Sequence, residues 1–258
     1  MKAVREIAPV VLPPIALLLF VILAWQLVVR FGHIETYLLP SPIAVARAAW
    51  TKRTELCGAL TLTAAGALCG FAASLIVGTL IAVAFSFSRI IKASCYPYAV
   101  FLQTVPIVAI APLIVVWFDY GFQSVALIAF IISLFPIITN ATTGLTNVDR
   151  ELVDLFELHN ANRRQVLFKL RLPSAVPYLV TGARISSGMA VIGAIVGEFF
   201  TGYGATRFGL GYLIMQATNR MKTDELFAAV IASTALGMAV FTVVNIVGAT
   251  VLSRWYHA

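Results

Sequence analysis

Long apolar runs without a charged residue constrain this chain more than any other feature. A helix needs about 20 consecutive, mostly apolar residues to cross a bilayer. Uncharged runs of that order or longer lie at 9–29, 56–88, 93–118, 120–148 and 226–253, and a sixth run, 173–206, holds only Arg184 and Glu198. We therefore predict an all-α, polytopic membrane protein with about six spans, at approximately 9–30, 58–88, 93–118, 122–146, 176–201 and 226–252.

The composition agrees with this prediction. Hydrophobic residues make up 60% of the 258 residues and charged residues only 11%, whereas a soluble domain carries about 25% charged residues. A transmembrane β-barrel would show many alternating segments of about ten residues, and the sequence has no such alternation. We expect residues 1–258 to form a single transmembrane domain.

The net charge of +7 does not indicate nucleic-acid binding, because the cations lie between apolar runs and no soluble domain could carry a basic face. Membrane topology explains them better. With both termini in the cytoplasm, ten Lys and Arg residues lie inside and seven outside, which agrees with the positive-inside rule. We expect both termini to be cytoplasmic.

The N-terminal segment resembles a signal peptide, since Lys2 and Arg5 precede an apolar run. That run exceeds the usual length of about 7–15 residues and no A-x-A-like site follows it, so we expect an uncleaved first span. After this span, Ser41 is placed to cap a short helix that begins at Pro42. We expect this helix at the outer membrane surface.

Cysteine and histidine residues give no sign of a metal site. Cys57, Cys69 and Cys95 are odd in number and lack C-x-x-C spacing, so neither a disulfide framework nor a zinc site is indicated. The three histidines show no metal-ligand spacing. With no catalytic constellation in the sequence, a membrane enzyme is disfavoured.

Glycines in the second apolar run indicate close helix packing. Gly58, Gly66, Gly70 and Gly78 are separated by multiples of four residues, which places them near one helical stripe. Small residues let membrane helices approach closely. A G-x-x-x-G pair at 193–197 repeats the spacing.

Prolines inside the third and fourth predicted spans indicate kinks, because each removes a backbone donor. Three such prolines are Pro106, Pro112 and Pro136. Such kinks are tolerated where neighbouring helices or a water-filled cavity satisfy the freed groups. With Gln103 and Asn140 nearby, we expect these helices to line a path for a polar solute. The alternative is that the polar groups only bond between helices.

A polar segment separates the fourth and fifth predicted spans. Its five cations in 147–177 face four anions, so it is not a one-sided polybasic anchor. Asp149 is placed to cap a first amphipathic helix. Asn160 can adopt the left-handed conformation of a turn, and Asn162 with Gln165 forms a capping-box pattern for a second helix that ends, or leads into the next span, at Pro173.

The same segment resembles a motif of a known family. The residues Asp154, Asn160, Leu170, Leu172 and Pro173 stand at the spacing of E-A-A-x-x-x-G-x9-I-x-L-P, found in the permease subunits of binding-protein-dependent ABC importers. The chain also resembles the nitrate/sulfonate/taurine branch of this family. The similar segments follow one another in the same order as in that branch, at 39–42 (LPSP), 105–113 (VPIVAIAPL), 117–118, 173–184, Glu198 and 209–213. Nearly the whole chain is covered.

The resemblance implies a type I ABC importer permease fold whose coupling loop, 147–175, docks on a cytoplasmic ATPase. The docking residues so implied are Asp154, Leu155, Phe156, Asn160, Ala161, Arg163, Leu170 and Pro173. Three positions depart from the motif: its Glu is Asp154, its two alanines are Leu155 and Phe156, and its Gly is Asn160. The bulkier pair suggests an ATPase groove shaped for this subunit. An interfacial helix is the alternative for this loop.

Two ionisable residues of the fifth span are candidates for a functional role, because charges within a membrane are costly. Arg184 and Glu198 are fourteen residues apart, roughly 21 Å along a helix, so they cannot pair directly. Arg184 is expected near the cytoplasmic end, and Glu198 near the outer end, where it anchors a gate or the loop 202–211. The candidate residues of the path or gate are thus Gln103, Pro106, Asn140, Arg184 and Glu198.

The function implied is that of a permease subunit which forms a translocation pore as a dimer in a bacterial inner membrane. Its implied partners are cytoplasmic ATPase subunits, a periplasmic or lipid-anchored solute-binding protein and a second copy of itself. The chain has no phosphate-binding P-loop motif, so we expect ATP and Mg on the partner ATPase, no cofactor on this chain, and no enzymatic activity of its own. The implied solutes are small anions such as nitrate, sulfonates, taurine or bicarbonate, or vitamin precursors. The alternative class is an autonomous secondary transporter or channel.

Overall fold

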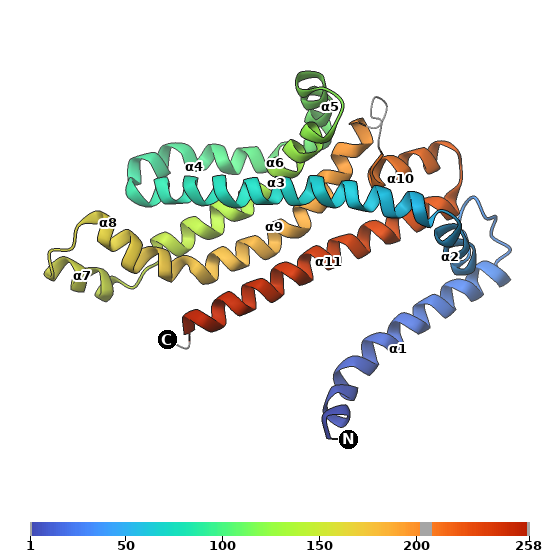
Figure 1. Ribbon diagram of the computed structural model, residues 1–258, viewed down its shortest axis with the longest axis horizontal. Helices are drawn as coiled ribbons and strands as arrows, with labels where there is room; N and C mark the ends of the chain where they lie inside the picture. The colour runs from blue at the N-terminus through green and yellow to red at the C-terminus, as the bar shows by residue number, and fades with distance from the viewer. Residues whose placement is uncertain (1, 202–207, 257–258) are drawn as a thin grey trace. The chain divides into compact units, whose positions relative to one another are not determined.

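The computed structural model describes residues 2–201 and 208–256, with side chains placed for 12–201 and 208–253. Regular structure in these residues is helical, as predicted (Figure 1). The elements are α1 (Lys2–Phe31), α2 (Pro42–Thr51), α3 (Arg53–Phe87), α4 (Arg89–Thr104), α5 (Ile107–Phe118), α6 (Phe122–Thr146), α7 (Arg150–Leu158), α8 (Arg163–Val166), the π-helical turn η1 (Leu167–Arg171), α9 (Leu172–Thr201), α10 (Leu210–Asn219) and α11 (Thr223–Tyr256).

Within the described residues, five helical segments are long and apolar enough to cross a membrane. They are Leu12–Phe31, Arg53–Phe87, Phe122–Thr146, Arg163–Thr201 and Thr223–Ser253. The pair α4 and α5 brings the number to six if it is counted as one bent span. The prediction of an all-α protein with about six spans is therefore confirmed.

The third predicted span, 93–118, is not one continuous helix. The chain bends by 98° between α4 and α5. Val105 is extended, with φ −72° and ψ 124°, because the ring of a following proline disfavours the helical region. Pro106 then stands immediately before α5. The kink expected inside a span at Pro106 is thus a complete break.

The chain forms two compact units, one made of residues up to Cys57 together with Leu213–Ala232 and the other of the remainder. In the smaller unit, Val45 and Ala48 of α2 pack against Ala228 of α11. The Oγ of Ser41 accepts a hydrogen bond from the Ala44 N–H at 3.2 Å, so the predicted short, capped helix after the first span is confirmed.

Two of the cations beside α2 are stabilised locally. The Nζ of Lys52 lies 2.8 Å from the Oε2 of Glu55, and this hydrogen bond raises the pKa of the Lys52 ammonium. Arg53 lies over the ring of Trp50, 5.1 Å from its centroid, at a distance where a cation is attracted to an aromatic face.

In the larger unit, α6 packs against α3 and α9 through glycines. A Cβ placed on Gly70 of α3 would lie 2.6 Å from both the carbonyl oxygen of Ala126 and the Cβ of Ala129. From α9, a Cβ on Gly193 would lie 2.7 Å from the Cα of Ala129. The predicted stripe therefore does bring helices close together. Gly58 is the exception, because it faces open space.

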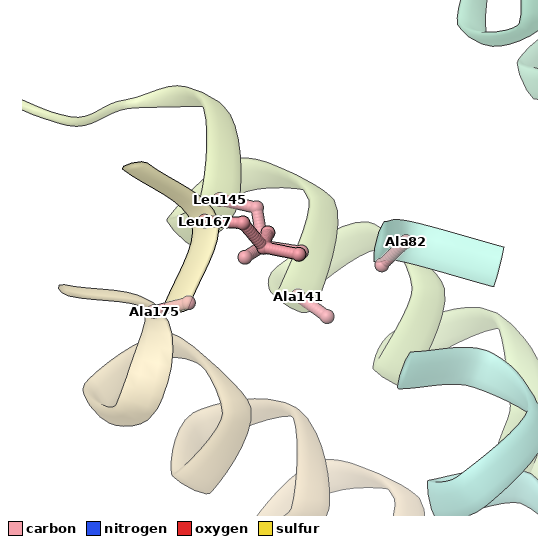
Figure 2. Close-up of a cluster of buried hydrophobic side chains, with 5 residues drawn as sticks. All are labelled: Ala82, Ala141, Leu145, Leu167 and Ala175. Carbon is pink, nitrogen blue, oxygen red and sulfur yellow. The ribbon is translucent and has the colours of Figure 1, made fainter. Parts of the chain in front are cut away.

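A buried hydrophobic cluster joins one end of these helices to the segment that follows α8. Figure 2 shows its members, Ala82 of α3, Ala141 and Leu145 of α6, Leu167 of η1 and Ala175 of α9. Burial of apolar surface stabilises such a contact by roughly 25 cal/mol per Å². The cluster fixes the base of the polar segment between α6 and α9.

Candidate functional site

The polar loop 147–175 is built by local capping interactions. The carboxylate of Asp149 accepts a hydrogen bond from the Glu151 N–H at 3.1 Å and begins α7. Asn162 Oδ1 accepts from the Gln165 N–H at 2.8 Å, while Gln165 Oε1 accepts from the Asn162 N–H at 2.7 Å. The predicted cap and capping box are both confirmed.

Asn160 reverses the chain between the two helices of the loop. Its φ is 52°, in the left-handed region that few residues other than glycine adopt at little cost. Its N–H donates to the carbonyl oxygen of Glu157 at 2.9 Å. The predicted left-handed turn at Asn160 is confirmed, and Asn takes the place that glycine has in the family motif.

An open groove of about 390 Å³ lies between α7 and the helix that follows the turn. The residues that line it are Leu155, Phe156, His159, Ala161, Gln165 and Lys169. Leu155 is 48% exposed, and Asp154 and Arg163 are exposed. Of the eight predicted docking residues, three line this groove. The apolar residues at the alanine positions of the motif are therefore available for contact with another protein.

The base of the loop is held in the body of the larger unit. Leu167 and Leu170 are buried, and Pro173 is the second residue of α9, inside the helical segment Arg163–Thr201. The guanidinium of Arg171 donates to the Ser86 carbonyl oxygen at 2.7 Å and so joins η1 to the end of α3. The sequence analysis assigned no role to Arg171, because a hydrogen bond to a backbone carbonyl 85 residues away leaves no local pattern.

The predicted path residues do not gather at one point. Gln103 and Pro106 are exposed at the break between α4 and α5. Asn140 Nδ2 donates within its own helix to the Pro136 carbonyl oxygen at 2.8 Å. Arg184 of α9 lies beside Gly248 of α11, and its buried Nε has no hydrogen-bond partner among the described residues.

Glu198 lies in a buried polar node formed by four residues. Its Oε2 accepts a hydrogen bond from the Thr63 hydroxyl of α3 at 3.0 Å and one from the Gly211 N–H at 2.8 Å. The Leu210 N–H donates to the Thr63 Oγ1 at 2.9 Å. Glu198 is 4% exposed and Thr63 is fully buried. We refer to Thr63, Glu198, Leu210 and Gly211 as the polar node.

The polar node agrees with part of what the sequence indicated. Glu198 was expected to anchor a gate or the loop 202–211, and it contacts the end of that loop, while residues 202–207 lie outside the described part of the chain. Sequence reasoning missed Thr63, because a threonine in an apolar span carries no specific signal. Its hydroxyl also lies 3.0 Å from the Ala59 carbonyl oxygen, a common contact within a helix.

Metal binding finds no support in the geometry. Within the described residues, no three His, Cys, Asp or Glu side chains lie close enough together to hold a metal ion. The carboxylates of Asp149 and Glu198 accept hydrogen bonds from backbone and hydroxyl groups instead.

The fold and the loop define a class of protein: a polytopic membrane protein that presents a structured, partly apolar loop anchored to its spans. The chain belongs to the family described as binding-protein-dependent transport system inner membrane component, which matches residues 74–256. It is a permease subunit of an ATP-driven ABC importer and not an enzyme, since the ATPase of such importers is a separate subunit. This decides against an autonomous secondary transporter or channel.

Relatives of known name support the assignment. A probable ABC transporter permease protein of Haemophilus influenzae is 34% identical over 230 residues, which are 89% of this chain and 92% of the relative. The formylaminopyrimidine transport permease protein ThiX of Halalkalibacterium halodurans is 32% identical over 235 residues, 91% of this chain and 92% of ThiX. Others are named for riboflavin, aliphatic sulfonate, bicarbonate and nitrate transport.

A solved structure shares the fold. The MetNI methionine ABC transporter in an inward-facing conformation matches with a TM-score of 0.53 and 21% identity, over 77% of this chain and 96% of the matched chain. At this identity the likeness shows the fold alone.

Proposed function

We propose that the loop 147–175 is the surface on which a cytoplasmic ABC ATPase docks, and that two copies of this chain form the pore. The observation that supports this proposal most directly is the geometry of the loop. A capped helix, a left-handed turn and a second capped helix present an apolar groove at one end, while Leu167 and Arg171 fix the other end to the spans. A force applied at the groove would reach α3, α6 and α9.

The remaining parts of the proposal follow from this one. With the loop in the cytoplasm, both termini are cytoplasmic and the whole chain acts as one permease domain. ATP and Mg are bound by the partner ATPase. A solute-binding protein delivers the solute from outside, as the family description implies. The residues of the break at 103–106, with Asn140, Arg184 and Glu198, belong to the path or its gate.

The solute class we propose is a small anion or a vitamin precursor. The named relatives divide between these two classes. The buried Nε of Arg184 has no hydrogen-bond partner among the described residues. A cation within a span is costly, so an anionic solute beside Arg184 would be favoured. Binding measurements on the solute-binding protein that delivers solute to this permease would distinguish the classes.

The docking assignment is tested by charge reversal at Asp154, which is exposed on α7. We expect Asp154→Lys to reduce the ATPase recovered with the affinity-tagged permease at least about tenfold, since unfavourable charge pairs at an interface cost several kcal/mol. Glu35→Lys is the matched control, because it makes the same reversal at an exposed position in the turn after α1. Equal recovery of the ATPase with both variants would reject the docking assignment.

A further inference from the structure

The polar node satisfies a helix terminus inside the protein. The first N–H groups of a helix have no partner within it, and leaving such a group buried and unpaired is costly. At the start of α10, the Leu210 N–H is bound by Thr63 and the Gly211 N–H by Glu198. A carboxyl oxygen at this end also interacts favourably with the helix dipole. Two side chains, from α3 and α9, therefore hold the first turn of α10.

Close packing around the node leaves little freedom for an alternative arrangement. A Cβ placed on Gly209 would overlap the carboxyl group of Glu198, and one placed on Gly211 would overlap the carbonyl oxygen of Ile195. The backbone that leads into α10 thus lies directly against α9. A displacement of α9 at this point must either carry the first turn of α10 with it or break the node.

The end of α3 is also joined to η1, the segment that leads into α9. There Arg171 binds the Ser86 carbonyl oxygen, and Leu167 and Ala82 belong to the same buried cluster (Figure 2). Arg171 and Glu198 are separated by roughly 40 Å at the rise of a helix. Between these two joints, glycines of both helices pack against α6. The two helices are therefore connected at both ends and along their length.

We propose that Thr63 and Glu198 are positioning residues that transmit an ATP-driven displacement of α3 and α9 to the first turn of α10. This inference rests on the proposed docking of the ATPase at 147–175, because that is where the displacement would start. The hydroxyl of Thr63 links the two helices to α10, since it both donates to Glu198 and accepts from Leu210.

The test compares hydrogen–deuterium exchange in the assembled permease–ATPase complex with and without trapping by ATP and vanadate. In the wild-type complex, trapping is expected to change the exchange of peptides from the loop 147–175 and of peptides that cover 208–216. Thr63→Val removes the hydroxyl and keeps the side-chain shape. We expect it to raise the exchange rate of the Leu210 amide roughly tenfold without ATP, as loss of one hydrogen bond predicts. We also expect it to weaken the trapping response at 208–216 and to leave the response of the loop unchanged, since Glu198 still binds the Gly211 N–H.

Matched variants separate this role from a general effect on folding. Thr63→Ser keeps the hydroxyl and should restore the response. Thr61→Val removes a hydroxyl of the same helix that, within the described residues, donates to the Gly58 carbonyl oxygen, and it should leave the response intact. If Thr63→Val fails to assemble, Thr63→Ala removes the same hydroxyl without introducing a branched side chain. We expect Thr63→Ala to weaken the trapping response at 208–216 in the same way.

The outcomes also distinguish this inference from the docking proposal. If trapping changes nothing at 147–175 in the wild-type complex, the docking assignment is wrong and the inference falls with it. If the loop responds and 208–216 responds equally in the wild type and in Thr63→Val, the docking assignment stands and the role of Thr63 is rejected. The same weakening of the response in Thr63→Ser would also reject it, because the hydroxyl would then not be the cause.

Discussion

Single residues of the loop hold conformations that their side chains favour. Asn160 is one of four described non-glycine residues with positive φ, the others being His33, Asp119 and Met221. An Asn side chain tolerates this region better than most. At the position where the family motif has glycine, the chain keeps the backbone geometry and changes the side chain. The departure from the motif is therefore conservative in structure.

Substitution at Asn160 tests this explanation. We expect Asn160→Gly to assemble with the ATPase as the wild type does, because glycine adopts φ near 52° without strain. Asn160→Val should reduce assembly, since a left-handed conformation costs an ordinary residue roughly 1–2 kcal/mol and a β-branched one more. Co-purification and limited proteolysis of the loop measure the effect. Equal behaviour of both variants would contradict the role of the turn.

Buried polar residues depend on partners far away in the sequence. The Thr63 and Glu198 side chains are joined by a hydrogen bond across 135 positions. Sequence reasoning found Glu198 because an acidic residue in a span is conspicuous. It could not find Thr63, because the partner of a buried carboxyl group is chosen by the packing of two helices.

At the scale of elements, helix ends followed local chemistry closely. Ser41, Asp149 and Asn162 cap the helices that they were predicted to cap. The break after α4 was not predicted, because a proline in an apolar run can either kink a helix or end it. Which of the two occurs depends on whether neighbouring groups satisfy the freed backbone, and the sequence does not contain that information.

Packing of α3 on α6 gives a prediction about glycine. Gly70→Leu would place a large side chain where the backbone of α6 already lies, and overpacking of this kind costs at least about 1–3 kcal/mol. We expect a lower Tm of the detergent-solubilised protein. Gly58→Leu is the matched control on the same helix, because Gly58 faces open space, and its Tm should remain near that of the wild type. Similar losses in both variants would argue against close α3–α6 packing.

At the scale of the whole molecule, orientation in the membrane decides where each partner binds. The modest excess of cations in the loops assigned to the inside predicts that the loop 147–175 lies in the cytoplasm. The turn after α1, which contains Glu35, would then lie outside.

Cysteine labelling tests the orientation directly. In a variant whose three native cysteines are replaced, we expect His159→Cys to react with a membrane-impermeant maleimide only when the reagent reaches the cytoplasmic face. Glu35→Cys should react from the outside. Both positions are exposed. The permease is expressed without its ATPase, which would otherwise cover the groove that His159 lines. Labelling of His159→Cys in intact cells would contradict the proposed topology.

The sequence by itself determined the helical class, most of the spans and the internal design of the polar loop. These depend on the length of apolar runs, on capping side chains and on the conformational preference of single residues, all of which act within a few positions along the chain. Only the tertiary structure decided the 98° bend at Pro106, the anchoring of Arg171 on Ser86 and the polar node at Glu198. Each of these depends on which helices meet, because a buried donor or acceptor takes whichever partner the packing places beside it.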